Sequence, residues 1–427
     1  MAATASLRWD ARQWALLVVL AGNMLVDALE VSIVLPALPS IAGDLGLTIG
    51  GAHWLMSGFA AGFAATLLAG PALTARYGRR RLYLLALLVF AAASVVGGLA
   101  GSVVVLVATR VVKGACAAFT APSGLAIIGR AFAEPAARSR AISVYSLFGA
   151  AGFTVGLLLS GVLTAASWRW VLVFTAPVAL LLMAVAVRLI PPDTGERVPV
   201  SRTRLLTRRP LVRAAAGAAL LNGTYLGLLL LTTFALQERL SWRPWQVALA
   251  FLPACVPLAV SAPVSGRLVA RFGAARLIAL GAAAVTAGYL LRLVSPVPDS
   301  YLLGILPTLL LVGAAFVLSF TALNKCALDE VGEGDRPGAV ALYQSAVQCG
   351  AVLMLWLVAT LRAHSATDRP ALFALTACGA LACAVAAVRR FRPEVSSYDP
   401  DPRPAPRARR GARRPGPRRD GTPAREG

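Results

Sequence analysis

Twelve long apolar segments fill most of the 427-residue chain, and they restrict its fold more than any other feature. Hydrophobic residues make up 58% of the sequence and charged residues 14%, a composition that excludes a soluble globular protein of this length. Most segments approach the ~20 residues that a helix needs to cross ~30 Å of hydrocarbon. They lack the two-residue alternation of a lipid-facing β-barrel, so we expect helices. The segments span roughly residues 14–38, 52–73, 82–100, 102–128, 141–165, 168–190, 211–236, 245–266, 275–294, 301–325, 338–361 and 371–388.

A ten-residue motif occurs twice, at 73–82 and 268–277, and both copies read L-x-A-R-aromatic-G-x-x-R-L. Each copy is a short basic turn between two apolar segments, so the positive-inside rule assigns both to the cytoplasmic face. An even number of crossings must therefore separate them, which six spans per half satisfy. We predict an all-α membrane protein made by tandem duplication, with twelve transmembrane helices in two six-helix bundles.

The distribution of basic residues predicts the orientation. In this topology 33 of the 41 lysines and arginines fall in cytoplasmic segments and six fall outside, which puts both termini in the cytoplasm. The net charge of +22 is then explained by topology and by anionic lipid, and nucleic acid is not an expected partner. Only two of the 41 basic residues are lysines, which suggests a GC-rich bacterial genome and a bacterial cell membrane.

Composition also divides the chain. We expect an amino-terminal bundle over 1–190, a cytoplasmic linker rich in Pro and Arg over 191–210, a carboxy-terminal bundle over 211–390, and a disordered basic tail over 391–427. The 20-residue linker leaves no room for two further helices. The six cysteines lie in or beside apolar segments without metal-binding spacing, so we expect no disulfide, no metal and no cofactor.

Four ionisable side chains lie within predicted spans, where charges are costly enough to suggest function. Asp27 and Glu30 are three residues apart on the first span, with Asn23 one turn earlier, and Arg110 and Lys113 repeat the spacing on the fourth. If the pairs face each other their charges cancel. The cluster could then be a structural ion pair or a protonation switch, in which a carboxylate that loses its arginine takes up a proton.

The first span reads LEVSIVLPALPSI over residues 29–41, which resembles the L-D-x-T-I-V-N-V-A-L-P-x-I signature of major facilitator drug:proton antiporters. Glu30 falls on the acidic position. The resemblance extends to the basic turn at 73–82 and to Arg110 and Gly114, which match an R-x-x-Q-G pattern, and it covers nearly the whole chain.

The resemblance implies alternating access between two bundles, with Glu30 preferred, and Asp27 possible, as the proton-coupling acid beside Arg110. It also implies that the two basic turns act in gating through Arg76, Gly78, Arg79, Arg271 and Gly273. Three positions depart from the family pattern. Ala75 and Ala270 replace an aspartate associated with the cytoplasmic gate, and Lys113 replaces a glutamine, so we expect Lys113 either to neutralise Asp27 or to receive an anionic substrate group.

Few charges lie at depth in the carboxy-terminal half, so a substrate cavity there would rely on neutral polar groups. We predict a cavity between the bundles lined by Asn23, Lys113, Asn222, Tyr225, Gln344 and Gln348. Each carboxy-terminal candidate could instead be an ordinary polar contact between helices. Prolines at 253, 257 and 263 should bend the eighth span.

These observations predict a secondary active transporter, expected to be a monomer, that exports amphipathic small molecules such as drugs or a self-made antibiotic in exchange for protons. Its expected partners are a small-molecule substrate, protons and membrane lipids. Alternatives of the same fold are a proton-independent facilitator or importer and a transport-dead sensor that signals through the tail. A polytopic membrane enzyme is disfavoured, because the outer loops hold only Asp44, Glu238, Asp299 and Asp368 as acids.

Overall fold

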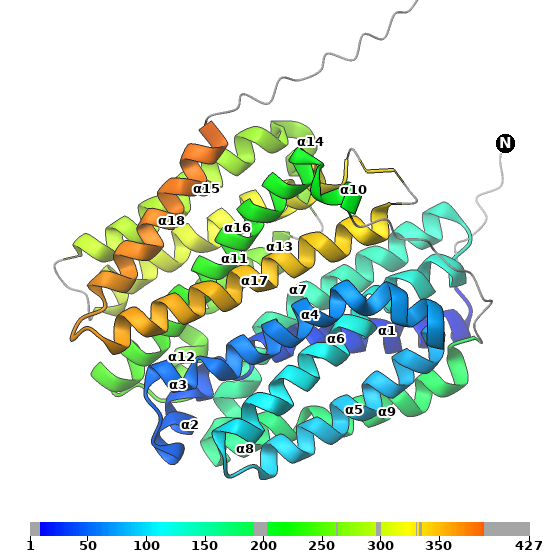
Figure 1. Ribbon diagram of the computed structural model, residues 1–427, viewed down its shortest axis with the longest axis horizontal. Coiled ribbons are helices and arrows are strands. Elements are labelled where there is room, and N and C mark those ends of the chain that lie inside the picture. Colours follow the sequence, from blue (N-terminus) through cyan, green and yellow to red (C-terminus); the bar gives the residue numbers. More distant parts are fainter. Residues whose placement is uncertain are drawn as a thin grey trace, which may run out of the picture. The chain divides into compact units, whose positions relative to one another are not determined.

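The computed structural model describes residues 9–191, 203–261, 264–295, 300–329, 331–332 and 335–387, and every regular element in those ranges is helical. The predicted tail over 391–427 and most of the predicted linker lie outside these residues. Figure 1 shows the helices as a stack of long, nearly parallel rods.

The amino-terminal half contains six long helices and several short ones. In chain order they are α1 (Ala11–Ser32), η1 (Leu35–Ala37), α2 (Leu38–Leu45), α3 (Ile49–Ala52), α4 (Trp54–Tyr77), α5 (Arg79–Leu99), α6 (Val103–Ala131), α7 (Pro135–Ala166), α8 (Trp168–Val173) and α9 (Thr175–Leu189).

The carboxy-terminal half is preceded by a one-turn helix and repeats the plan. Its elements are α10 (Thr203–Leu206), α11 (Arg209–Phe234), η2 (Ala235–Arg239), α12 (Pro244–Ala250), α13 (Leu252–Ser261), α14 (Ser265–Phe272), α15 (Ala274–Val294), η3 (Tyr301–Ile305), α16 (Leu306–Leu328), α17 (Arg336–Ala363) and α18 (Arg369–Ala387).

All twelve predicted spans correspond to helices. Ten helical segments of the described residues are long and apolar enough to cross a membrane. An eleventh is the pair α12 and α13, bent by 49° at Phe251, where prolines were predicted to bend the eighth span. The twelfth is α18, a shorter apolar helix. The prediction of a multi-pass helical membrane protein is confirmed.

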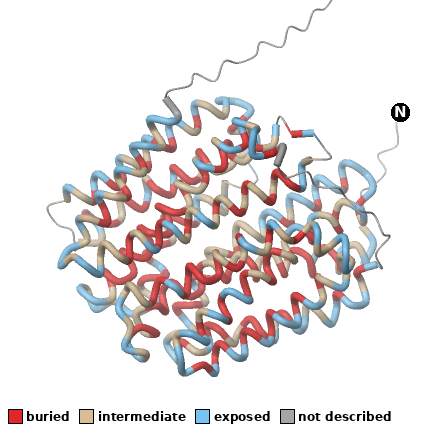
Figure 2. Tube along the Cα trace, viewed as in Figure 1, coloured by how far each residue is buried: buried red, intermediate tan, exposed pale blue. Residues whose placement is uncertain are grey.

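Beyond its first turn, which carries the exposed Arg81, the exposed side chains of α5 are apolar, as acyl chains require. Leu85, Leu88, Val96 and Leu99 are all about half exposed or more, although an aqueous surface would favour polar residues at such positions. Figure 2 shows the complementary pattern, with buried positions concentrated along the helices in the middle of the view. The span formed by α11 and η2 is the most deeply buried, with 83% of its most apolar window inside the protein.

Helices of each half pack mainly on one another. In the amino-terminal half α1 contacts α6, α7 and α9, and α6 contacts α4 and α5; in the carboxy-terminal half α11 contacts α16, α17 and α18. The halves meet where α4 and α3 lie against α17, and where α7 lies against α12 and α13. Ser345 donates a hydrogen bond across this interface to the Ala64 carbonyl at 3.1 Å.

Two glycines bring α4 and α6 into direct backbone contact. A Cβ atom on Gly62 would collide with the carbonyl of Val111, and one on Gly114 would collide with the carbonyl of Phe59. Small residues at such positions let helices approach closely in membranes. The approach matters because it brings the α4 carbonyl of Leu55 to 2.9 Å from the Arg110 guanidinium.

Candidate functional site: a buried charge cluster in the amino-terminal half

Three polar side chains form one stripe along α1, and all are buried. Asn23 is 2% exposed, Asp27 6% and Glu30 0%. Arg110 and Lys113 on α6 are equally enclosed, at 0% and 1%. Of the two acids of the first span, only Glu30 lies against the cations of the fourth span.

Glu30 is held mainly by Arg110. The guanidinium Nη1 pairs with Glu30 Oε2, and Nη2 donates to the Glu30 backbone carbonyl at 2.6 Å. Nε donates to the Leu55 carbonyl on α4 at 2.9 Å, and the ring of Phe59 lies 4.9 Å from the guanidinium carbon. Each nitrogen of this arginine therefore has a partner, and the side chain joins α1, α4 and α6.

Lys113 also pairs with Glu30. Its Nζ lies 2.5 Å from Oε1, so each carboxylate oxygen of Glu30 faces a different cation. Nζ donates a second hydrogen bond to the Thr175 hydroxyl on α9 at 3.1 Å and lies 4.7 Å from the centre of the Phe90 ring. Of the two roles expected for Lys113, neutralising Asp27 is wrong, because the lysine pairs with Glu30 instead. The other role, receiving an anionic substrate group, stays a prediction.

Asp27 has neutral partners only. Asn23 Nδ2 donates to its Oδ2 at 3.0 Å, and the Thr120 hydroxyl on α6 donates to the same oxygen at 2.7 Å. Among the described residues no cation lies within ion-pair distance of this carboxylate. Two acids that look alike in sequence therefore have different surroundings, since Glu30 is bonded to two cations and Asp27 to an amide and a hydroxyl.

The location of the cluster differs from the expected one. Its hydrogen-bond, ion-pair and ring partners lie on α1, α4, α5, α6 and α9, all in the amino-terminal half. We had expected these charges to face a cavity shared by the two halves. They lie inside one half because the helices that carry the cluster and its partners pack on one another there.

Comparison with known proteins identifies the chain's family. The family model described as Major Facilitator Superfamily matches residues 20–354. The chain belongs to the major facilitator superfamily. It is therefore a multi-pass membrane transporter, as the resemblance of its first span indicated.

Relatives within the superfamily are named for antibiotic resistance and export. The chain is 32% identical to the puromycin resistance protein pur8 of Streptomyces alboniger over 411 residues, which cover 82% of this chain and 81% of the relative. It is 28% identical to the cephamycin export protein CmcT of Amycolatopsis lactamdurans, covering 80% and 83%. It is 26% identical to the lincomycin resistance protein of Streptomyces lincolnensis, covering 79% and 82%.

A solved structure has the same fold. The crystal structure of a bacterial homologue of the human lysosomal transporter Spinster, in an inward-facing and unoccupied conformation, matches with a TM-score of 0.69. The match covers 89% of this chain and 97% of the other at 16% identity, so it supports the superfamily fold and no more.

The two basic turns have the same backbone geometry. Gly78 has φ 86° and ψ 147°, and Gly273 has φ 80° and ψ 140°, in a region that favours glycine. Arg76 and Arg271 each place the guanidinium 5.3 to 5.4 Å from the ring of the following aromatic residue. The sequence repeat is thus a structural repeat, and the gating role of these residues and of Arg79 stays a prediction.

One basic contact was not predicted at this turn. Arg80 Nη2 donates to the Val187 carbonyl near the end of α9 at 2.6 Å. The bond ties the start of α5 to the end of α9 through a helix carbonyl. Its signal in the sequence was only the run of three arginines.

In the carboxy-terminal half the predicted cavity residues have mixed surroundings. Asn222 Nδ2 donates to the Val347 carbonyl on α17 at 3.3 Å, which makes it a contact between helices. The Tyr225 hydroxyl lies 3.2 Å from Cys255 Sγ. Gln344 and Gln348 are half-buried on α17, and neither amide has a hydrogen-bond partner among the described residues.

A row of aromatic rings, absent from the predictions, joins the two halves near Tyr225. Phe153 on α7 lies 5.9 Å from the Tyr225 ring, which lies 4.9 Å from Phe316 on α16; Phe316 stacks on Phe320 at 5.1 Å. Aromatic pairs at these distances contribute to packing beyond their buried area. No spacing rule connects the three helices, so the row could not be predicted from the sequence.

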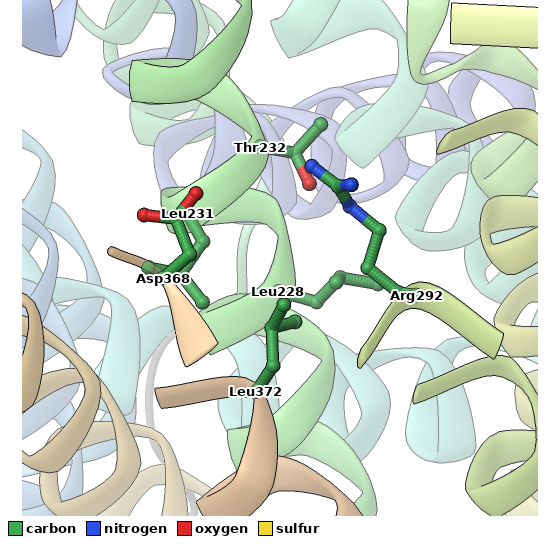
Figure 3. A pocket seen from close by; sticks show the side chains of 6 residues that line it. All are labelled: Leu228, Leu231, Thr232, Arg292, Asp368 and Leu372. Atoms are coloured by element: carbon green, nitrogen blue, oxygen red, sulfur yellow. The ribbon is translucent and has the colours of Figure 1, made fainter. Parts of the chain in front are cut away.

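A small cavity lies in the carboxy-terminal half (Figure 3). It holds space for about one water molecule and is lined by Leu228, Leu231, Thr232, Arg292, Asp368 and Leu372. Arg292 points its guanidinium toward Thr232, while Asp368 pairs with Arg239 at 3.2 Å and Arg362 at 2.8 Å. Drug-sized ligands need cavities of ~300 Å³ or more, so this one is not a substrate site.

Proposed function

We propose that this transporter exports amphipathic small molecules, such as an antibiotic, in exchange for protons. Its two halves, residues 1–190 and 211–390, would rock about a central site to give alternating access. The protein would lie in a bacterial cell membrane as a monomer, with both termini in the cytoplasm. Substrate, protons and lipids would be its partners.

The observation that carries the proposal is the buried charge cluster, defined as Asp27, Glu30, Arg110 and Lys113. Ionisable groups at such depth are expensive, and in membrane proteins they mark ion pathways and proton relays. A proton entering down the membrane potential supplies ~2.3 kcal/mol per 100 mV, enough for concentrative transport when a buried acid accepts it. The names of the relatives support export as the direction.

A substrate surface of neutral and aromatic groups fits the same proposal. Tyr225 and the aromatic row offer apolar area between the halves, and the amides of Gln344 and Gln348 remain without partners among the described residues. Such a surface suits molecules that are largely apolar with a few polar groups. This surface does not require the substrate to be charged.

Everted membrane vesicles test this function. The chain is expressed in a drug-sensitive bacterium, and a growth screen that begins with puromycin finds a compound to which it confers resistance. Vesicles should accumulate that compound when their lumen is acidic and lose it when an ionophore collapses the proton gradient, whereas vesicles without the chain should not. Uptake indifferent to the gradient would support the facilitator, and resistance to no compound would contradict export.

A further inference from the structure

We propose that Asp27 carries the coupling proton and that Glu30 stays ionised throughout the transport cycle as the fixed counter-ion of Arg110 and Lys113. This assignment rests on the proposed function and names the residue within it. It reverses the preference that the family signature gave to Glu30. The reason lies in what each carboxylate touches.

Glu30 has no capacity left for a proton. Both of its carboxylate oxygens face cations, Arg110 at Oε2 and Lys113 at Oε1, and its side chain is fully enclosed. A proton there would leave two buried cations beside a neutral acid. Breaking a buried ion pair by removing one charge is strongly destabilising, so protonating Glu30 would oppose folding instead of driving transport.

Asp27, in contrast, has a carboxylate oxygen that can accept a proton. Both of its hydrogen bonds end on Oδ2, and no described residue donates to Oδ1, which is therefore the atom available for a proton. At 6% exposure it is also the most accessible of the four charged side chains, the other three lying between 0% and 1%. Neutral donors stabilise the ionised carboxylate but do not hold it in that form as a paired cation would. A group that alternates between two protonation states requires such surroundings.

The titratable groups around Asp27 come from four helices. Glu30 on α1 repels the ionised carboxylate; Tyr83 on α5, Cys116 on α6 and Tyr145 on α7 are its other electrostatic neighbours. The Tyr145 hydroxyl donates to the Ala121 carbonyl at 2.8 Å, but the buried Tyr83 hydroxyl has no hydrogen-bond partner among the described residues. Tyr83 is thus a polar group able to bind a water that reaches Asp27.

The proton balance is simple. A proton from water forms an O–H bond at Asp27 Oδ1, and the same bond breaks when the proton leaves to the opposite side. With Asp27 ionised the four charges of the cluster sum to zero, and with Asp27 protonated they sum to +1. Glu30, Arg110 and Lys113 keep their charges in both states, so a single residue reports the state of the site.

Infrared difference spectroscopy during a pH titration tests this assignment without a substrate. On acidification the purified full-length chain should show, beside the signal of its water-exposed acids, a separate carbonyl stretch from a protonated carboxylic acid that is shielded from water. Asp27→Asn should lose that band, whereas Glu30→Gln and the surface control Asp329→Asn should keep it. A band lost in Glu30→Gln and kept in Asp27→Asn would overturn the proposal, as would a wild type without any such band.

Transport separates this inference from the function on which it rests. In liposomes, Asp27→Asn should abolish accumulation driven by the proton gradient of the compound found in the growth screen, while retaining its downhill exchange. Asp27→Glu, which keeps an acid at the site, should restore gradient-driven uptake with a shifted pH profile, an outcome that a purely structural role would not give. If wild-type uptake ignores the gradient, the proposed function fails; if Asp27→Asn still responds to it, only the assignment fails.

Discussion

The first helix of each half shows how differently the two copies of the duplication are used. The two basic turns are 195 residues apart in the sequence. The same offset aligns Asp27 with Asn222 and Glu30 with Tyr225. The acids of α1 have partners inside their own half, and Asn222 and Tyr225 on α11 likewise contact α17 and α13 of theirs, through an amide and a hydroxyl. At these aligned positions the amino-terminal half keeps acids and the carboxy-terminal half keeps neutral side chains.

This difference teaches that duplication fixes the fold but leaves the interior chemistry of each half free. The turns at Gly78 and Gly273 remain alike because their backbone conformation requires glycine. The interior positions of α1 and α11 have diverged because hydrogen-bonded neutral groups and paired charges both satisfy a buried site. The proton coupling that we propose would then use the amino-terminal half.

The largest expected effect comes from Glu30→Gln. It leaves Arg110 and Lys113 buried without a counter-charge, which should cost about 3–5 kcal/mol of stability and abolish gradient-driven transport. The matched control Tyr225→Phe, at the equivalent position of the other half, should change stability far less. Thermal unfolding of both variants in detergent measures the contrast, and equal midpoints would contradict the division between the halves.

Removing a cation together with Glu30 tests whether the charges of the cluster interact. Combining Lys113→Met with Glu30→Gln removes one of the two uncompensated cations, so the double variant should recover part of the lost stability. Groups in one ion-pair network are expected to couple in this way. Additive losses in a thermal unfolding cycle would show that Lys113 and Glu30 do not interact.

Gly114→Ala should cause the next largest loss of stability. Its methyl group would collide with the Phe59 carbonyl, which forces α4 and α6 apart at a cost of about 1–3 kcal/mol. Gly129→Ala on the same helix is the control, because nothing lies within 4 Å of its Cβ position. Thermal unfolding should separate the two; a neutral Gly114→Ala would mean that the helices do not approach closely there.

Alanine at Gly78 or at Gly273 tests the equivalence of the halves directly. Both residues have positive φ with open space around a Cβ atom, so backbone strain alone should cost about 1–2 kcal/mol at each. The two losses should be equal within error. Thermal unfolding measures both losses of stability. A large loss at one turn and none at the other would show that the two turns are not equivalent in the protein in solution.

The smallest effect is expected at Asn222. Leucine there removes one hydrogen bond between α11 and α17, and such bonds contribute on average ~0.6 kcal/mol in membrane proteins. Transport should persist with an unchanged pH profile, in contrast to Asp27→Asn at the aligned position. Loss of gradient-driven uptake in Asn222→Leu would place part of the coupling in the carboxy-terminal half.

Most of the fold was predictable because membrane crossings depend on length and composition. The bend at Phe251 and the glycine turns also had local signals, in Pro253 and Pro257 and in the repeated motif. The facing of Glu30 and Arg110 followed from charge balance at depth. Each of these predictions depends on the sequence of a single helix or turn, or on one pair of opposite charges.

The partners of each acid were not predictable, because they depend on how far one helix slides along another. A shift of one turn would pair Lys113 with Asp27, which is one of the two roles predicted for this lysine. Thr120 carried a usable signal, since it lies two turns beyond Lys113 on the same face of α6. Thr175 and the aromatic row carried none, because they come from helices whose approach is a property of the packed protein.

Gradient-driven transport in liposomes tests the central claim most directly. The purified chain is reconstituted, a proton gradient is imposed as the only energy source, and accumulation of the compound found in the growth screen is followed together with proton movement. We expect accumulation above equilibrium with proton flux in the opposite direction, and we expect both to be absent in Asp27→Asn. Equilibration to equal concentrations, with or without the gradient, would contradict it.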